Sequence, residues 1–185
     1  MNGPAHFSIF STEISTADQF RNSTRAKPRA SKTGASEVQK KSASEREARD
    51  SIAGFTVIND VTARDWQNRT LQWLQGKTFE GSTPVGPNLV TMDVDKVIEE
   101  GLGLSCEVNG EEMQRAVTSD LLFNPVFLVS YISKILTLRP GDVIATGTPG
   151  GVGHARNPQR YLKDGDILVT RVEGVGELRN ICKSA

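Results

Sequence analysis

The sequence predicts a mainly β fold of the α+β class with a few short helices. Runs of β-prone residues outnumber segments with helical periodicity, and most connections are short, which favours antiparallel pairing. The clearest local signal is Asn109-Gly110 between the runs 104–108 and 111–115, because Asn-Gly tolerates the positive φ angles of a type I′ hairpin turn. These observations favour a sheet-rich domain over a helical bundle.

The individual elements follow from local signals along the chain. Ser44 with Glu47 three residues later predicts a capping box, which begins a short helix that Gly54 is expected to end. The elements expected after it are a strand at 55–58, a helix at 61–67 capped by Asp60, loops at 72–79 and 83–87, a strand at 89–92, the Asn-Gly hairpin, a helix at 120–136, a strand at 143–146, and a terminal hairpin of 167–173 and 177–182.

Composition divides the chain into a tail and a domain. The 185 residues are 37% apolar, and 22 basic residues balance 22 acidic ones. Residues 1–50 carry nine basic and six acidic side chains, a net charge of +3, so residues 51–185 carry 13 and 16, a net charge of −3. This predicts a disordered, basic Ser/Thr/Lys/Arg-rich tail at 1–41 and a folded domain at 42–185. The tail is interpreted as inert, with a targeting segment or a contact with RNA or lipid as alternatives.

Composition also disfavours several classes of function. The balanced charge argues against a nucleic-acid-binding protein, and no apolar run approaches the roughly 18 residues that a membrane helix needs. Cys106 and Cys182 are too few for a disulfide framework or a zinc site, which favours a cytoplasmic location. The only histidines are His6 and His154, so a histidine-rich metal centre is excluded.

The segment 59–67, Asn-Asp-Val-Thr-Ala-Arg-Asp-Trp-Gln, is the first candidate for chemistry. Asp60, Arg64 and Gln67 are spaced i, i+4 and i+7, which on a helix places them on one face. A carboxylate, a guanidinium and an amide on one face can bind an oxyanion or a metal-bound acid. The spacing alone favours a structural interpretation, in which Asp60 caps the helix and Arg64 makes a surface ion pair.

Two glycine-containing segments are further candidates. Lys77 follows Gly76, where a fixed cation can point into a cleft, although a solvated loop lysine is the plainer interpretation and the pattern is not a P-loop. The run 147–153 lacks the context of a dinucleotide site, but its glycines allow Thr148 and backbone N–H groups to approach a ligand closely. His154, which follows this run, is interpreted as incidental.

Taken together, the motifs of residues 44–182 resemble the C-terminal catalytic domain of the fumarylacetoacetate hydrolase family. The resemblance implies a fumarylacetoacetase-type mixed β-roll with a few helices, usually assembled as a homodimer. The motifs that carry it are Ala-Gly-Phe-Thr-Val-Ile-Asn-Asp-Val-Thr-Ala-Arg-Asp-Trp-Gln at 53–67, Gln-Gly-Lys-Thr-Phe at 75–79, Pro-Val-Gly-Pro at 84–87, Val-Asn-Gly-Glu at 108–111 and Leu-Arg-Pro-Gly-Asp-Val-Ile-Ala-Thr-Gly-Thr-Pro-Gly-Gly-Val-Gly at 138–153.

The resemblance also implies an activity and a site. The family cleaves or isomerises 2,4-dioxo acids and related oxo-dienoates with Mg2+ or a similar cation such as Mn2+ or Ca2+, which implies a metal-dependent C–C hydrolase of the acylpyruvate or fumarylacetoacetate type. Asp60 matches a metal-binding aspartate, and Lys77 matches a catalytic lysine beside the metal and the substrate oxygens. Arg64 and Gln67 match residues that contact the substrate acid, and Thr148 matches a threonine that holds its carboxylate. Positive charge from the cation, Lys77 and Arg64 would stabilise an enolate.

Two motifs of the family are not found in this chain. Family members carry an upstream Gly-x-Asn-Tyr-x-x-His-x-x-Glu segment with the acid/base dyad, and a Glu-x-Glu pair that completes the metal site. Glu45-Arg46-Glu47 has that second spacing, but Glu47 precedes Asp60 by only 13 residues and is interpreted as part of the capping box. Metal binding by Asp60 alone is expected to be weak. The alternatives are a 2-hydroxyhepta-2,4-diene-1,7-dioate isomerase or decarboxylase of aromatic-compound breakdown, or a truncated, inactive copy that serves as a dimerising or ligand-binding scaffold.

Overall fold

The structure is a computed structural model, and it describes residues 6–12, 15–16, 20–22 and 40–184. Strands dominate it and the helices are short, which confirms the predicted mainly β, α+β class. The strands are β1 (His6–Thr12), β2 (Ser15–Thr16), β3 (Phe20–Asn22), β4 (Ile52–Asn59), β5 (Thr62–Ala63), β6 (Val85–Val90), β7 (Gly103–Val108), β8 (Glu111–Val117), β9 (Asp142–Ala145), β10 (Ile167–Val172) and β11 (Gly176–Ser184). The α-helices are α1 (Glu45–Ser51), α2 (Arg64–Gln67), α3 (Val94–Glu99) and α4 (Pro125–Ile135), and the 3-10 turns are η1 (Trp73–Gly76), η2 (Thr118–Asp120) and η3 (Gly153–Ala155).

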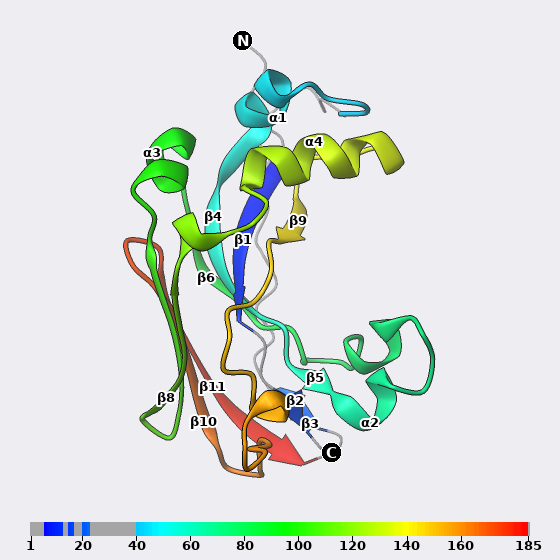
Figure 1. Cartoon of the computed structure of the whole chain (residues 1–185), viewed down its shortest axis with the longest axis vertical. Coiled ribbons are helices and arrows are strands. Elements are labelled where there is room, and N and C mark those ends of the chain that lie inside the picture. Colours follow the sequence, from blue (N-terminus) through cyan, green and yellow to red (C-terminus); the bar gives the residue numbers. More distant parts are fainter. Residues whose placement is uncertain (1–5, 13–14, 17–19, 23–39, 185) are drawn as a thin grey trace.

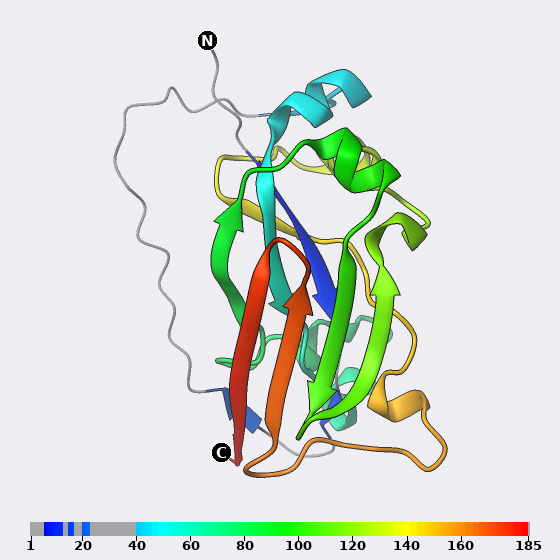
Figure 2. The ribbon, with the colours of Figure 1, turned by 90° about the vertical axis from the view of Figure 1, so that its left-hand side faces the viewer.

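Two larger sheets and a short strand pair organise the described chain. One sheet has the order β6-β4-β1-β9, in which β1 runs parallel to both β4 and β9. The other has the order β3-β11-β10-β7-β8 with antiparallel pairing, and β2 pairs with β5. Helices α1, α3 and α4 gather at one end of the molecule, and α2 lies near the other end beside β5 (Figure 1). No described helix passes in front of the five-stranded sheet in the side view (Figure 2).

The N-terminal region differs from the predicted disordered tail at 1–41. Within that range the structure describes β1, β2 and β3, and β1 is hydrogen-bonded between β4 and β9. The partners of β1 lie more than 40 residues away along the chain, at 52–59 and 142–145. Composition indicates whether a segment can fold by itself. It does not show whether distant strands supply the hydrogen bonds that hold the segment as a strand. The rest of the predicted tail up to residue 39 lies outside the described residues.

Several local predictions are confirmed. Ser44 accepts from the backbone N–H of Glu47 while the Glu47 carboxylate accepts from the Ser44 N–H, which is the predicted capping box of α1. Asn109 and Gly110 have φ angles of 54° and 82°, as a type I′ turn between β7 and β8 requires. The helix predicted at 120–136 is present, but α4 begins only at Pro125, after an Asn124 cap, because a proline at the first position costs no helix hydrogen bond.

Other boundaries are wrong for identifiable reasons. Helix α1 ends at Ser51, and Gly54 lies inside β4, where a Cβ would come within 2.5 Å of the Val90 carbonyl oxygen. Gly54 therefore marks a close approach of two strands rather than a helix end. The expected loop at 83–87 enters β6 because it pairs with β4, and the expected loop at 72–79 contains η1. Helix α3, begun by the Asp93 cap, was not expected.

The main apolar core lies between the two larger sheets and under the helices. Strand β4 is buried along nearly its whole length, as is typical of a strand covered on both faces. Phe55 and Val57 of β4 are fully buried, and they cluster with Leu104 of β7 and with Val126 and Val129 of α4. A second cluster beneath the lower part of the five-stranded sheet contains Cys106 and Leu168. The core thus fixes β4, and β4 leads directly into the candidate site.

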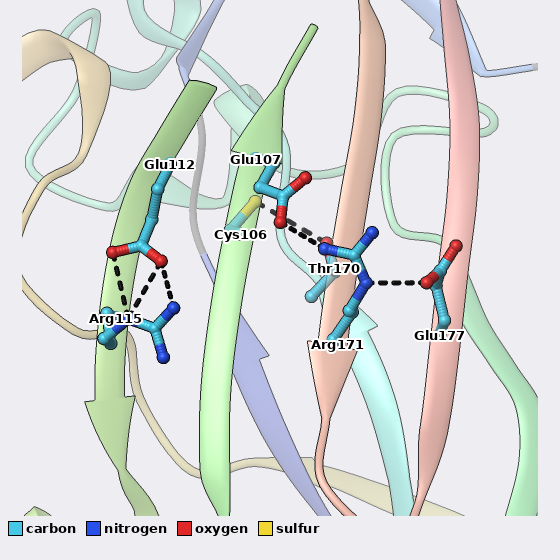
Figure 3. Close-up of polar contacts among 7 residues, drawn as sticks. All are labelled: Cys106, Glu107, Glu112, Arg115, Thr170, Arg171 and Glu177. Carbon is cyan, nitrogen blue, oxygen red and sulfur yellow. Dashed lines mark hydrogen bonds and ion pairs between the residues drawn. The ribbon is translucent and has the colours of Figure 1, made fainter. Parts of the chain in front are cut away.

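The outward face of the five-stranded sheet is polar and held by ion pairs (Figure 3). Arg171 of β10 bridges Glu107 on one neighbouring strand and Glu177 on the other, with 2.6 Å between its Nε and Glu177 Oε2. Arg115 pairs with Glu112 within β8. Opposite charges across neighbouring strands stabilise register. This face therefore needs no helix to cover it.

Neither cysteine takes part in a disulfide, and both Cys106 and Cys182 are buried. Burial, with the nearby Asp166 and Asp164 carboxylates, raises the pKa of the Cys182 thiol to about 12, so this thiol stays protonated at neutral pH. No helix among the described residues is long and apolar enough to cross a membrane.

Candidate active site

Asp60 and Lys77 form the centre of the candidate site. Asp60 follows the last residue of β4, and its carboxylate Oδ2 accepts from Lys77 Nζ at 2.5 Å. Lys77 Nζ also donates to Thr62 Oγ1 at 3.1 Å. The side chains of Asp60 and Lys77 are each 23% exposed, so the pair is largely shielded yet open to a small ligand. A cation held by two oxygens in this setting is a fixed charge rather than a solvated loop lysine.

Gly76 explains why Lys77 reaches this position. A Cβ at Gly76 would come within 2.7 Å of the Ala63 carbonyl oxygen and 2.8 Å of the Gln67 Cα, so only glycine allows η1 to pack against the start of α2. The Lys77 N–H then closes the 3-10 turn by donating to the Leu74 carbonyl. The glycine therefore brings the following lysine to the end of β4.

Arg64 and Gln67 form a second pair, and it corrects the predicted helical face. Helix α2 begins only at Arg64, Ala63 is its N-cap, and Asp60 precedes it by four residues, between β4 and β5. Asp60 is thus not a helix cap, and the i, i+4, i+7 pattern does not lie on one helix. Arg64 Nη1 donates to Gln67 Oε1 at 2.6 Å, and Gln67 is buried. The buried glutamine holds the guanidinium of Arg64 in place.

Thr148 belongs to a separate group of contacts in the loop between β9 and η3 (Figure 1). Its Oγ1 accepts from Gln114 Nε2 of β8 at 3.2 Å, and the same nitrogen donates to the Pro149 carbonyl at 2.9 Å. Thr148 also lines a small pocket of about 90 Å³ with Leu104, Thr118 and Leu121. Among the five predicted site residues, hydrogen bonds between described residues join Asp60 to Lys77 and Arg64 to Gln67. The hydrogen bond described for Thr148 is to Gln114, outside both pairs.

Sequence reasoning missed three residues that shape the site. Thr62 holds Lys77, Gln114 holds Thr148, and Asn59 anchors the end of β4. The fully buried Asn59 donates from Nδ2 to Thr170 Oγ1 at 2.9 Å, across 111 residues of chain, and so ties β4 to the five-stranded sheet next to Asp60. Asn59 and Thr62 lie inside the 59–67 motif, so their place in that motif could have identified them as candidate site residues. Gln114 gives no such signal, because its burial follows from an irregular register between β7 and β8.

The described residues do not by themselves fit a resident divalent ion. They contain no group of three or more His, Cys, Asp or Glu side chains able to hold a metal. Asp60 is a single carboxylate, and one of its oxygens is bonded to Lys77. Mg2+ is coordinated by about six oxygen atoms. Proteins commonly supply one or two of these from carboxylates, and water or substrate supplies the rest. Glu45 and Glu47 lie in the first turn of α1, and Glu47 is engaged in the capping box as predicted.

These features define a sheet-rich domain that carries a shielded lysine–carboxylate pair, and a family comparison is consistent with that class. The model of the fumarylacetoacetate (FAA) hydrolase C-terminal domain matches residues 34–182. The chain therefore belongs to the fumarylacetoacetate hydrolase family, as the sequence motifs predict.

Individual relatives agree with this assignment. Oxaloacetate tautomerase fahd2, mitochondrial, from Xenopus laevis is 44% identical over 142 residues, which are 76% of this chain and 44% of that protein. A fumarylacetoacetate hydrolase structure from Exiguobacterium antarcticum has a TM-score of 0.75 and 39% identity, covering 80% of this chain and 53% of the other. A fumarylpyruvate hydrolase from Pseudomonas aeruginosa, in complex with Mn2+ and pyruvate, has a TM-score of 0.65 and 27% identity, covering 91% and 72%. The chain spans about half the length of the curated relatives it matches.

Proposed function

We propose that this chain acts on small 2-oxo acids through an enol or enolate, and that keto–enol tautomerisation is the reaction its site supports best. The observation that carries this proposal is the Lys77 ammonium held between Asp60 and Thr62 at 2.5 and 3.1 Å. Tautomerisation moves one proton between carbon and oxygen and breaks no carbon–carbon bond. The developing charge lies on a single oxygen, which one fixed cation can stabilise.

Each predicted site residue has a part in this proposal. Lys77 is the catalytic residue: its Nζ–H bonds to the oxygen at C2 of the substrate as the enolate forms, and Asp60 and Thr62 keep that N–H donor in place. Arg64, held by Gln67, and the Thr148 hydroxyl bind the substrate carboxylate. The proton that leaves C3 returns to the C2 oxygen to give the enol, so the reaction needs no oxidant or second substrate.

Hydrolysis of the C–C bond of a 2,4-dioxo acid is the second candidate. The family description and the fumarylpyruvate hydrolase neighbour favour it, and it leaves an enolate of the same kind. The tautomerase names of relatives with 44–46% identity favour the first candidate, and the isomerase names of structural neighbours favour proton transfer generally. Two further alternatives are a role in aromatic-compound breakdown and a role as a scaffold without activity.

The cofactor and the cellular location are proposals as well. The Mn2+ in the Pseudomonas neighbour supports a divalent cation for this family, and in this chain Asp60 is the residue that would bind Mg2+, Mn2+ or Ca2+. With one carboxylate we expect a dissociation constant on the order of millimolar. The balanced charge supports a protein that does not bind nucleic acid, and the lack of a long apolar run supports one without a membrane helix. A cytoplasmic location is proposed from the cysteine content, whereas the Xenopus relative is named mitochondrial.

The proposed function is tested with oxaloacetate and with an acylpyruvate. We expect the 185-residue chain to accelerate the loss of oxaloacetate enol absorbance in proportion to protein concentration. The assay is run with Mg2+ and with a chelator, and the Asp60→Asn variant tests whether any metal response passes through Asp60. Decay of the acylpyruvate band in parallel reactions measures hydrolysis. Acceleration of neither reaction by folded protein would contradict both candidate activities and support the scaffold.

We also propose that the chain forms a homodimer through an apolar stripe that begins just before α4 and continues along it. The stripe consists of Phe123, Phe127, Tyr131 and Ile135, which are spaced four residues apart. Its rings stack at centroid distances of 4.9 and 6.0 Å, and Tyr131 and Ile135 are 52% and 68% exposed. Helix α4 buries its opposite side through Val126 and Val129. A two-fold axis would set identical stripes against each other, which removes this apolar surface from water.

Sedimentation of purified protein tests the stripe. The wild-type chain is expected to sediment as a dimer at micromolar concentration, and Tyr131→Glu is expected to shift it to monomer, because a charge would be buried without a partner. Leu71→Glu is the matched control, since Leu71 is 98% exposed and lies outside the stripe. Monomeric wild-type protein, or a dimer unaffected by Tyr131→Glu, would refute the proposed interface.

A further inference from the structure

We infer that Asn59 is a positioning residue that holds the Asp60–Lys77 pair in place through its hydrogen bond to Thr170. This inference rests on the proposed function, in which Lys77 is the catalytic residue. Asn59 directly precedes Asp60 and is fully buried, so it acts through its neighbour rather than by touching a ligand. Thr170 lies on β10, in the other large sheet. The bond therefore connects the candidate site to a strand that contributes none of the predicted site residues.

The side chain of Asn59 interrupts an apolar face of β4. Side chains two residues apart along a strand lie on the same face, so Asn59 belongs to the face of Phe55 and Val57. Both of those residues are fully buried in the main core. An apolar residue at position 59 would continue this face, and the asparagine breaks the pattern at the last residue of the strand. Breaks of this kind are expected beside functional sites.

The residues that meet Asn59 break the apolar pattern of their own strands. Thr170 stands between Leu168 and Val172 on the buried face of β10, and it is only 1% exposed. Its Oγ1 accepts from Asn59 Nδ2 at 2.9 Å. Cys106 of β7 lies opposite Thr170, and its Sγ is 3.6 Å from both Thr170 Oγ1 and Asn59 Nδ2 (Figure 3). A polar contact thus replaces apolar packing between the two sheets beside the candidate site.

This polar contact is a poor source of stability. Asn59 Oδ1 is buried and has no hydrogen-bond partner among the residues that the structure describes. A buried carbonyl oxygen in this state opposes folding, whereas replacing both members of a buried pair by apolar groups of similar shape is often neutral or stabilising. Leucine has the branching of asparagine, and valine has the shape of threonine. An apolar pair at positions 59 and 170 is therefore expected to fold at least as well.

The hydrogen bond adds direction to the contact between the sheets. Apolar packing is non-directional, so an apolar pair would tolerate small shifts of the end of β4. A hydrogen bond has a preferred distance and angle, so the bond to Thr170 fixes the peptide that leads to Asp60. The N–H groups of Asn59 and Val61 donate to carbonyls of the segment 82–84 at 3.1 Å each. The side-chain bond adds a third restraint, toward the five-stranded sheet.

The position of Lys77 depends on that of Asp60, because Lys77 Nζ donates to Asp60 Oδ2 at 2.5 Å. A shift of the peptide at Asp60 would therefore move the ammonium away from the substrate oxygen. Displacements of about 1 Å in an active site can lower the rate on the order of 10²-fold. The effect is expected mainly on kcat, because the charge that Lys77 stabilises develops in the transition state.

A double variant of the 185-residue chain, Asn59→Leu with Thr170→Val, tests the inference. It removes both polar partners, so neither is left buried without the other. The urea midpoint of the double variant is expected to equal or exceed the wild-type midpoint. Its kcat with oxaloacetate is expected to fall about tenfold, with a smaller effect on KM. A pair that served stability alone would lower the midpoint and the activity together.

Two further variants serve as controls. Thr170→Ser keeps the hydroxyl that accepts from Asn59 and is expected to keep kcat within about threefold of the wild-type value. Thr56→Val removes the hydroxyl of another buried threonine, which is 5% exposed and lies on the opposite face of β4. This variant is expected to leave kcat unchanged.

The outcomes separate this inference from the function on which it rests. Wild-type activity together with a double-variant kcat within about threefold of it would overturn the role of Asn59 alone. A double variant with a lowered urea midpoint would overturn that role as well, because the pair would then be structural. Absence of activity in folded wild-type protein would overturn the proposed function and this inference together.

Amide hydrogen exchange tests the same restraint without an enzymatic assay. The Val61 N–H is expected to exchange about tenfold faster in the double variant, because its bond to the Ser82 carbonyl lies one residue beyond Asp60. The Val57 N–H, inside β4, is expected to exchange at the wild-type rate and serves as the internal control. An unchanged exchange rate at Val61 would overturn the inference whether or not the protein is active.

Discussion

Replacing Lys77 by methionine is expected to lower kcat/KM for a 2-oxo acid by about 10²- to 10³-fold, the usual cost of removing a fixed donor to a developing oxyanion. The ammonium lies 2.5 Å from Asp60 and 3.1 Å from Thr62, so it is positioned before substrate arrives. Methionine keeps the length of the side chain and removes the charge. It also leaves the Asp60 carboxylate unpaired and largely shielded, which repels an anionic substrate.

The effect of Lys77→Met should fall mainly on kcat, because the charge on the C2 oxygen develops only in the transition state. Lys96→Met is the matched control, since Lys96 is an exposed lysine on α3 that pairs with Glu100. Steady-state kinetics on folded variants, checked by circular dichroism, give the measurement. A kcat/KM of Lys77→Met within threefold of the wild-type value would show that Lys77 is not a catalytic residue. A threefold change corresponds to roughly 0.7 kcal/mol of activation free energy.

Replacing Phe55 by alanine is expected to lower the free energy of unfolding by about 3–5 kcal/mol, a large part of the stability of a domain of this size. Phe55 is fully buried at the middle of β4, in the cluster that joins the two larger sheets and α4. Truncation removes the ring's transfer free energy and leaves a cavity. Strands on both sides of β4 hold the backbone in place, so the cavity cannot collapse easily.

Urea unfolding followed by tryptophan fluorescence measures this change. Leu71→Ala is the control, because Leu71 is 98% exposed, and its effect is expected to stay within about 0.5 kcal/mol. A loss below about 1 kcal/mol for Phe55→Ala would mean that β4 is not the centre of the core.

Locally encoded features could be predicted from the sequence. The capping box needs only Ser44 and Glu47, and the hairpin turn needs only Asn109 and Gly110, so neighbouring residues decide both. The candidate residues Asp60 and Lys77 were also recognised, and the structure joins them through a contact across 17 residues. Here the motif identified the participants, while the packing of Gly76 on α2 decided that they meet.

Features that depend on distant partners could not be predicted in this way. The pairing of β1 with β4 and β9 depends on strands elsewhere in the chain, so composition predicted disorder instead. The sequence predicts Asp60 as a helix cap, but β5 at 62–63 lies between Asp60 and α2, which begins only at Arg64. The helix predicted at 120–136 divides its apolar residues between the core and the surface: Val129 is buried and Ile135 is exposed.

The attachment of the Thr148 loop to β8 also affects how this protein behaves at high concentration. Strand β8 lies at the end of its sheet, where unpaired backbone groups invite another strand to add on. Arg156 occupies the Met113 carbonyl, and the close approach of Gly151 to the same oxygen covers that stretch of the edge. We therefore expect this loop to hinder edge-to-edge aggregation of the sheet. A side chain at position 151 is expected to lift the loop from β8 and so to lower the solubility of the protein.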